Sequence, residues 1–179
     1  GIHSRTDFDL KQHEEFSGKK LQYFDHEDNA SYTPYVLETS IGLDRMFLAV
    51  FSNSLVEEEL DNNTTRTVLK LPAVLAPVKA AILPLVKKDG LPEIARQIFD
   101  DLKWDFNMDY DEKDAVGRRY RRKDANGTPF CITVDHDTLE DQTVTIRHRD
   151  TMEQSRVKIS DLRDIIKKEV DVKEWLMKM

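Results

Sequence analysis

Glu38-Thr39-Ser40-Ile41-Gly42-Leu43-Asp44-Arg45 lies between two apolar runs, at 35–37 and 46–51, in a chain of 179 residues. This layout predicts a buried strand, a turn at Ser40 to Gly42, and a helix over about Leu43 to Glu58. The helix is apolar nearly all round, so we expect it to be buried on several sides. A carboxylate, a hydroxyl, a glycine and an arginine therefore meet at one junction between a strand and a helix.

Two interpretations of this junction stay open from spacing alone. Gly42 allows the backbone to approach a ligand closely, and Arg45 carries the side chain best suited to grip a phosphate or stack on a base. An ordinary glycine turn with a surface ion pair between Asp44 and Arg45 has the same spacing. Short motifs often occur by chance, so the neighbouring sequence must decide.

The composition limits the classes of function. The net charge is −7, and residues 1–60 hold 5 Lys and Arg against 12 Asp and Glu, whereas residues 61–179 hold 22 of each. Binding to nucleic acid must therefore depend on a local basic patch. No apolar run reaches the roughly 18 residues of a membrane span, and no signal peptide is visible. The sequence begins at Gly1, which fits a processed form or a fragment.

Cys131 is the single cysteine, which excludes a disulfide framework and a cysteine-based zinc site. A reducing, cytoplasmic location is the natural expectation. Cys131 lies among apolar residues in a predicted strand, so we expect a small core residue. Asp135-His136-Asp137 has no partner at metal-ligand spacing, and we interpret it as a loop turn. No metal site is predicted.

The second half of the chain has the pattern of an α/β domain. We expect strands at 78–86, with Pro84 at its end or edge, and at 106–110, 130–134, 143–147 and 157–159. Helices are expected from Leu91, with Pro92 near its first position, over 116–123 with a stop at Asn126-Gly127, and after Ser160-Asp161. The order β-α-β-α-β-β-β-α predicts a compact domain with a mixed sheet.

A polar break after residue 56 separates this domain from what precedes it. We expect a first domain at 1–58, a linker at 59–72 and a second domain at 73–179. Residues 68–179 should fold independently. A strand is also expected at 19–24, within a polar first segment that makes a poor core by itself.

Arg118-Arg119-Tyr120-Arg121-Arg122-Lys123 is the strongest local charge feature. On a helix, residues four apart share a face, which suits contacts to phosphates, and Tyr120 is either buried or stacks on a base. A solvated helix face paired with neighbouring acids fits the same composition. Contacts to a nucleic acid are predicted from Arg118, Arg119, Arg121 and Arg122.

Several stretches in order resemble one family. Residues 38–45 resemble motif 3 of class II aminoacyl-tRNA synthetases, and the form with Glu two residues before Ser is similar to glycyl-tRNA synthetases. Residues 1–13 resemble the segment that precedes motif 3. The stretches 71–77, 117–120, 124–130 and 147–154 resemble the C-terminal anticodon-binding domain. The resemblance covers nearly the whole chain, and several motifs in the right order are more specific than one.

The resemblance implies roles for the junction residues. Glu38 would accept the ammonium of glycine, Ser40 would line a pocket too small for a side chain, and Arg45 would bind ATP. The glycine-binding stretch would be Glu38, Thr39, Ser40, Ile41 and Gly42, and the ATP-binding stretch would be Gly42, Leu43, Asp44 and Arg45. Arg5 would face the adenylate. The implied partners are glycine, ATP with Mg²⁺, tRNA(Gly) and, in the full-length enzyme, a second copy in a homodimer.

The resemblance also implies that the chain is incomplete as an enzyme. Thr39 stands where many family members have Pro, and nothing matches the family's motifs 1 and 2, which supply much of the dimer interface and another ATP-binding arginine. We therefore expect the end of an antiparallel-sheet catalytic domain followed by an anticodon-binding domain, inactive alone. The alternatives are a non-catalytic accessory subunit of synthetase-like fold, or a prolyl, threonyl or histidyl synthetase. The Glu-x-Ser pair favours glycine.

Overall fold

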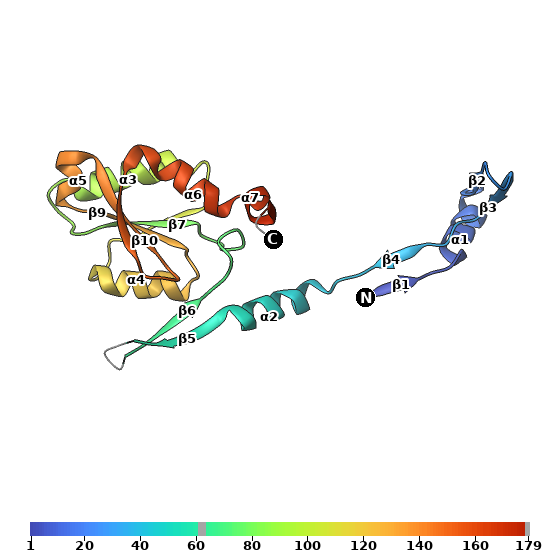
Figure 1. Cartoon of the computed structure of the whole chain (residues 1–179), viewed down its shortest axis with the longest axis horizontal. Coiled ribbons are helices and arrows are strands. Elements are labelled where there is room, and N and C mark those ends of the chain that lie inside the picture. The colour runs from blue at the N-terminus through green and yellow to red at the C-terminus, as the bar shows by residue number, and fades with distance from the viewer. Residues whose placement is uncertain (61–63, 178–179) are drawn as a thin grey trace. The chain divides into compact units, whose positions relative to one another are not determined.

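The computed structural model describes residues 1–60 and 64–177, which belong to two compact units, Gly1–Leu48 and Ala49–Met179 (Figure 1). The first unit holds two short antiparallel strand pairs. β1 (Ile2–Ser4) pairs with β4 (Leu37–Thr39), and β2 (Tyr23–Asp25) pairs with β3 (Ala30–Tyr32). Helix α1 (Phe8–Ser17) ends at Gly18, whose φ of 66° is left-handed. The strand that we expected over 19–24 therefore begins later, at Tyr23.

The first unit has no buried core. None of residues 1–48, all of which the structure describes, is buried. Many of its large apolar side chains are exposed instead, and a unit that leaves so much apolar surface in water gains little free energy from folding alone. These exposed side chains include Ile2, Phe8, Phe16, Tyr35, Leu37 and Ile41.

Helix α2 (Leu43–Ser54) starts where the sequence predicts, directly after the turn at 40–42. The predicted end of the helix near Glu58 is wrong, because Leu55–Glu59 forms strand β5. In β5 the side chains alternate, and Glu58 lies opposite Arg66 of the paired strand, which offers this carboxylate an ion pair that a helix would not. The prediction of a helix buried on several sides is also wrong, since Met46 and Phe47 are 48% and 67% exposed.

The segment 59–72, which we expected to be a linker, contains a strand. Strand β6 (Thr65–Leu69) pairs antiparallel with β5, and it buries Val68 and Leu69. Residues 61–63, which the polar break also includes, lie outside the described residues. The hairpin of β5 and β6 therefore belongs to the folded second unit.

The second unit is built on a five-stranded sheet in the order β11-β10-β9-β7-β8, and the prediction of a mixed sheet is confirmed. Strand β7 (Ala80–Pro84) is parallel to β8 (Met108–Tyr110) and β9 (Phe130–Val134). Strand β10 (Thr143–His148) is antiparallel to β9 and to β11 (Gln154–Lys158). Pro84 occupies the last position of β7, where its missing N–H costs the sheet least.

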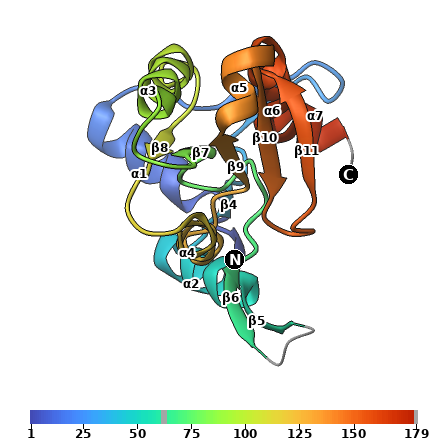
Figure 2. The same cartoon turned by 90° about the vertical axis from the view of Figure 1, so that its left-hand side faces the viewer.

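Helices cover the sheet unequally. α3 (Leu91–Leu102) and α6 (Leu162–Val170) lie over one face, and α4 (Val116–Ala125) lies over the other (Figures 1 and 2). Pro92 stands at the start of α3, and Gly127 follows α4 with a left-handed φ of 77°, as predicted. Three short helical elements in the described part of the second unit were not predicted: α5 (His136–Asp141), the 3₁₀ turn η1 (Ile159–Asp161) and α7 (Val172–Met177).

The main core lies under α3 and α6. Alternate residues of the strands, among them Ile82, Ile132 and Ile146, pack there against Leu91, Ile98, Leu162 and Ile166 of the helices. On the opposite face, α4 covers only a small cluster of Ala81, Leu83 and Cys131. The sheet is therefore dry on one face and partly open on the other. Within the described residues, we find no helix with the length and apolar character that crossing a membrane requires.

Cys131 is buried, and burial raises the pKa of its thiol to about 12. Because the thiolate is the reactive species, we expect alkylation of the native chain at pH 8 to be at least about 100-fold slower than alkylation in denaturant. Mass spectrometry over time measures this rate, with the denatured chain as the control. Equal rates in the two conditions would contradict the burial of Cys131.

Candidate functional site

The junction that opened the sequence comes from the end of β4 and the start of α2. Glu38 and Thr39 close the strand, Ser40 to Gly42 connect it to the helix, and Arg45 lies in the first helical turn. The backbone of Ser40 is tied to Gly1 in both directions, by bonds of 2.8 and 3.0 Å. The predicted strand and helix are confirmed, with residues 40–42 connecting them, but the prediction that the strand is buried is wrong, because all of β4 and every residue of 38–45 are exposed.

Arg5 lies beside this junction. Its Nε is 3.8 Å from the Glu38 carboxylate, and Asp9 accepts two shorter bonds of 2.9 and 2.8 Å from the same guanidinium. The ion pair between Asp44 and Arg45, which belongs to the alternative interpretation of an ordinary glycine turn, is not present among the described residues. The structure thus brings a carboxylate and a guanidinium together at Glu38 and leaves Arg45 available.

The basic cluster of α4 divides into inward and outward side chains. Arg119 is 1% exposed and donates to the carbonyls of Pro84, Asp111 and Leu85 at 2.7, 3.0 and 3.2 Å. Burial lowers the pKa of Arg119, since the charged form loses water. Arg119 therefore fastens α4 to the end of β7, and in this position it is not accessible to RNA.

Two more cations of α4 are held by acids of the preceding segment. Arg122 binds the carboxylates of Asp111 and Asp114 at 2.8 and 2.7 Å, and the buried Lys123 binds Asp109 at 2.5 Å. The sequence left open that cations of this cluster pair with neighbouring acids, and Arg122 and Lys123 do so. Arg118 and Arg121 are exposed, although Arg121 also lies 4.0 Å from the Asp124 carboxylate, and these two cations of α4 are the ones that a phosphate reaches most easily.

Arg118 and Arg121 line a cavity of about 390 Å³. Its wall also contains Arg147 from β10, whose guanidinium carbon lies 4.8 Å from the centre of the Tyr120 ring. The Tyr120 hydroxyl is 2.6 Å from Oγ1 of Thr133, so the ring is held at its hydroxyl by Thr133 and at one face by Arg147. We call this cavity the basic cavity, and its lining consists of Gly117, Arg118, Tyr120, Arg121, Arg147, Met152 and Gln154.

The partly open sheet face continues from the basic cavity. Pairing places Arg147 beside Gln154 and Thr145 beside Arg156, all on the face that α4 leaves partly uncovered. Arg147 and Arg156 were not predicted as site residues. The alternation of Thr143, Thr145 and Arg147 with Val144 and Ile146 was the available signal, because it assigns the polar side chains to one face.

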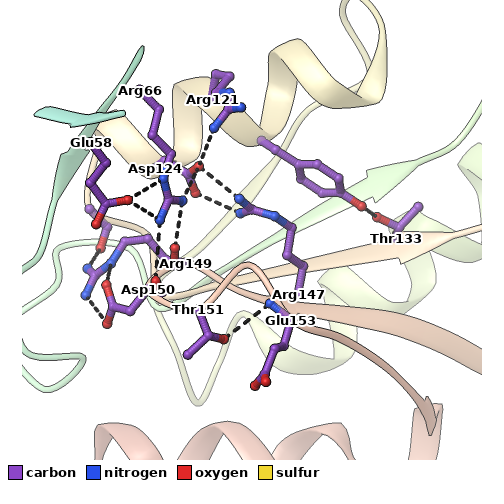
Figure 3. Close-up of polar contacts among 12 residues, drawn as sticks. Glu58, Arg66, Arg121, Asp124, Thr133, Arg147, Arg149, Asp150, Thr151 and Glu153 are labelled. Carbon is purple, nitrogen blue, oxygen red and sulfur yellow. Dashed lines mark hydrogen bonds and ion pairs between the residues drawn. The ribbon is translucent and has the colours of Figure 1, made fainter. Parts of the chain in front are cut away.

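Behind the basic cavity, the Asp124 carboxylate binds two arginines from distant parts of the chain (Figure 3). Arg147 donates to it twice, at 2.8 and 3.0 Å, and Arg66 donates at 3.1 Å. Arg66 also bonds Glu58, whose carboxyl pKa is lowered by the hydrogen bond of Lys70 and by Arg66, against the opposing effect of burial. We call Glu58, Arg66, Asp124 and Arg147 the buried ion network.

Asp135-His136-Asp137 is not the loop turn that we expected. Asp135 caps α5, because its side chain accepts the Thr138 N–H while the Thr138 side chain accepts the Asp135 N–H. Arg156 donates to the same Asp135 carboxylate at 2.5 Å. Among the described residues, no group of three or more His, Cys, Asp or Glu side chains could hold a metal ion.

The α/β fold with its mixed sheet, together with the basic cavity, is typical of the class of anticodon-binding domains. Residues 79–169 match the model of the anticodon binding domain family, and the chain belongs to that family. It is 53% identical to a glycine--tRNA ligase of Clostridium beijerinckii over 93% of its length, and 51% identical to one of Chlorobaculum tepidum over the same share. The chain spans about 35% of the length of these two relatives.

A solved structure supports the fold. The RNA binding domain of threonyl-tRNA synthetase from Cryptosporidium parvum Iowa II is similar with a TM-score of 0.65, over 83% of this chain and 35% of that one. The identity of 18% limits this likeness to the fold.

The two kinds of arginine on α4 should respond differently to truncation. Arg119→Ala removes a buried fork from three carbonyls, so we expect the free energy of unfolding to fall by about 2–4 kcal/mol. Arg118→Ala, which changes an exposed side chain on the same helix, should stay within about 0.5 kcal/mol of the parent. Urea denaturation followed by circular dichroism measures both. Equal losses would contradict the division into inward and outward arginines.

Proposed function

We propose that this chain is the C-terminal part of a glycine–tRNA ligase, which activates glycine with ATP and transfers it to tRNA(Gly). The identity of about half of the residues to glycine--tRNA ligases, over nearly the whole chain, carries the proposal. It favours glycine over the prolyl, threonyl and histidyl alternatives. The residues Glu38, Ser40, Gly42 and Arg45, all present, favour an enzyme over a non-catalytic accessory subunit.

The first unit would supply one edge of the catalytic domain. In this proposal Glu38 to Gly42 bind glycine, with Glu38 accepting its ammonium, and Gly42 to Arg45 bind ATP. A carboxylate beside a guanidinium, as in Glu38 and Arg5, suits a substrate with both an ammonium and an anionic group. ATP would bring Mg²⁺ with it. The exposed apolar side chains of residues 1–48 support a larger domain in the complete enzyme, which we propose to be a cytoplasmic homodimer.

We expect this polypeptide alone to show no glycine-dependent exchange between ATP and pyrophosphate. The reason is positional: residues 38–45 form an open surface here, and a pocket that excludes water is needed to orient glycine against the α-phosphate of ATP. Incorporation of labelled pyrophosphate into ATP is the measurement.

The glycine--tRNA ligase of Clostridium beijerinckii, assayed at the same molar concentration, serves as the positive control. Exchange above background by the 179-residue chain would overturn the assignment of an incomplete pocket.

The second unit would bind the anticodon loop. We propose that the basic cavity and the adjoining open sheet face form the RNA surface, with Arg118 and Arg121 contacting phosphates and Tyr120, backed by the buried Arg147, offering a planar group. Unpaired bases of a loop are recognised by stacking on aromatic or guanidinium planes and by hydrogen bonds to their edges. The burial of Arg119 and the pairing of Arg122 with two carboxylates assign them to support of the surface.

Binding to tRNA(Gly) should depend on the outward arginines. We expect Arg118→Ala with Arg121→Ala to weaken binding about tenfold or more and to reduce the dependence on log salt by about one unit per lost phosphate contact. Filter binding between about 50 and 200 mM salt measures this change.

Arg163→Ala is the matched control, because this exposed arginine of α6 lies over the other face of the sheet, with Asp105 as its partner. It should leave the affinity unchanged. A tRNA with an exchanged anticodon should bind more weakly than tRNA(Gly), and equal affinities would reject anticodon recognition.

A further inference from the structure

We infer that Arg66 is a positioning residue, which acts through the Asp124 carboxylate to hold the Arg147 guanidinium at the wall of the basic cavity (Figure 3). The inference rests on the proposed RNA-binding role of this cavity. It assigns to the hairpin of β5 and β6, which lies outside the matched residues 79–169, a part in shaping that site.

Arg66 is held from both sides of its guanidinium. Its side chain is 1% exposed, and Nε donates to the Glu58 carboxylate at 2.6 Å across the hairpin. From the other side, Nη1 donates to Asp124 at 3.1 Å and to the carbonyl of Arg149 at 2.9 Å. A planar guanidinium with several fixed partners has little freedom to reorient. The hairpin thus fixes the position of the positively charged Arg66 guanidinium behind α4.

Asp124 transmits this position to Arg147. Oδ2 accepts from Arg66 and also from Nη2 of Arg147 at 3.0 Å, while Oδ1 accepts from Nη1 of Arg147 at 2.8 Å. The Asp124 side chain is 0% exposed, so water cannot replace a lost donor without a rearrangement. Two arginines share one oxygen, and a shift of either donor changes the position that the carboxylate prefers.

Arg147, of which only 4% is exposed, transmits the change to the wall of the basic cavity. Its guanidinium carbon lies 4.8 Å from the centre of the Tyr120 ring, and both side chains line the basic cavity. Arg66 also bonds the carbonyls of Arg149 and Asp150, at the turn that leads to Met152 on the same wall. A change at residue 66 therefore reaches two parts of the lining without any direct contact with the cavity.

The test is Arg66→Lys in the full 179-residue chain, because lysine keeps the charge and loses the fork. NMR of the arginine side chains reports on Arg147 without any RNA. Its guanidinium N–H signals, identified by their loss in Arg147→Lys, should shift or broaden in Arg66→Lys. A fixed bidentate pair gives one orientation, whereas a loosened pair exchanges between several.

The second readout is the affinity for an anticodon stem-loop of tRNA(Gly). We expect Arg147→Lys to weaken binding about tenfold and Arg66→Lys to weaken it about three- to tenfold. The double variant should bind no more weakly than Arg147→Lys alone, because Arg66 acts through Arg147. Ile98→Val, chosen in the core under α3, is the control for lost stability and should leave both readouts unchanged.

Unchanged Arg147 signals in Arg66→Lys, or additive losses in the double variant, would overturn the positioning role. Shifted signals together with equal affinity of the wild-type chain for cognate and exchanged anticodons would support the positioning role and reject the proposed function. If Arg66→Lys does not fold, Glu58→Gln gives the same test. It leaves Arg66 in place and removes the charge that orients its Nε.

Discussion

The fully buried Asp124 carboxylate is the interaction on which the arrangement of the second unit depends. It neutralises charge on Arg66 and Arg147, which come from the hairpin and from β10. Removing one partner of a buried ion pair costs about 3–5 kcal/mol, since the other charge stays in a poorly solvated place. The Asp124 side chain therefore holds the β5–β6 hairpin, α4 and β10 together, and the basic cavity lies beside this contact.

The two units differ in how their apolar residues are used. In the second unit alternate strand residues pack beneath α3 and α6, so its fold follows from its own sequence. Residues 1–48 also carry large apolar side chains, but no residue among them is buried. Within residues 1–48, the apolar side chains of the first unit therefore do not pack into a core.

Sequence reasoning predicted the mixed sheet and most helices of the second unit because periodicity and the signals at Pro92 and Gly127 agree there. It failed at Leu55–Glu59, where three glutamates at a predicted helix end pair across a hairpin instead. It also did not single out Arg147, which lines the basic cavity, and it predicted tRNA contacts from Arg119, which is buried against backbone carbonyls. Both residues are arginines in the sequence, and only tertiary partners decide which one faces the cavity.

The buried ion network has a consequence for the order of folding. Arg66 bonds Asp124 and the carbonyl of Arg149, over separations of 58 and 83 residues. Contacts over such distances form late, because the intervening chain must first be ordered. During synthesis from the N-terminus, the hairpin leaves the ribosome long before its partners, and its arginine stays in water until β10 has been made.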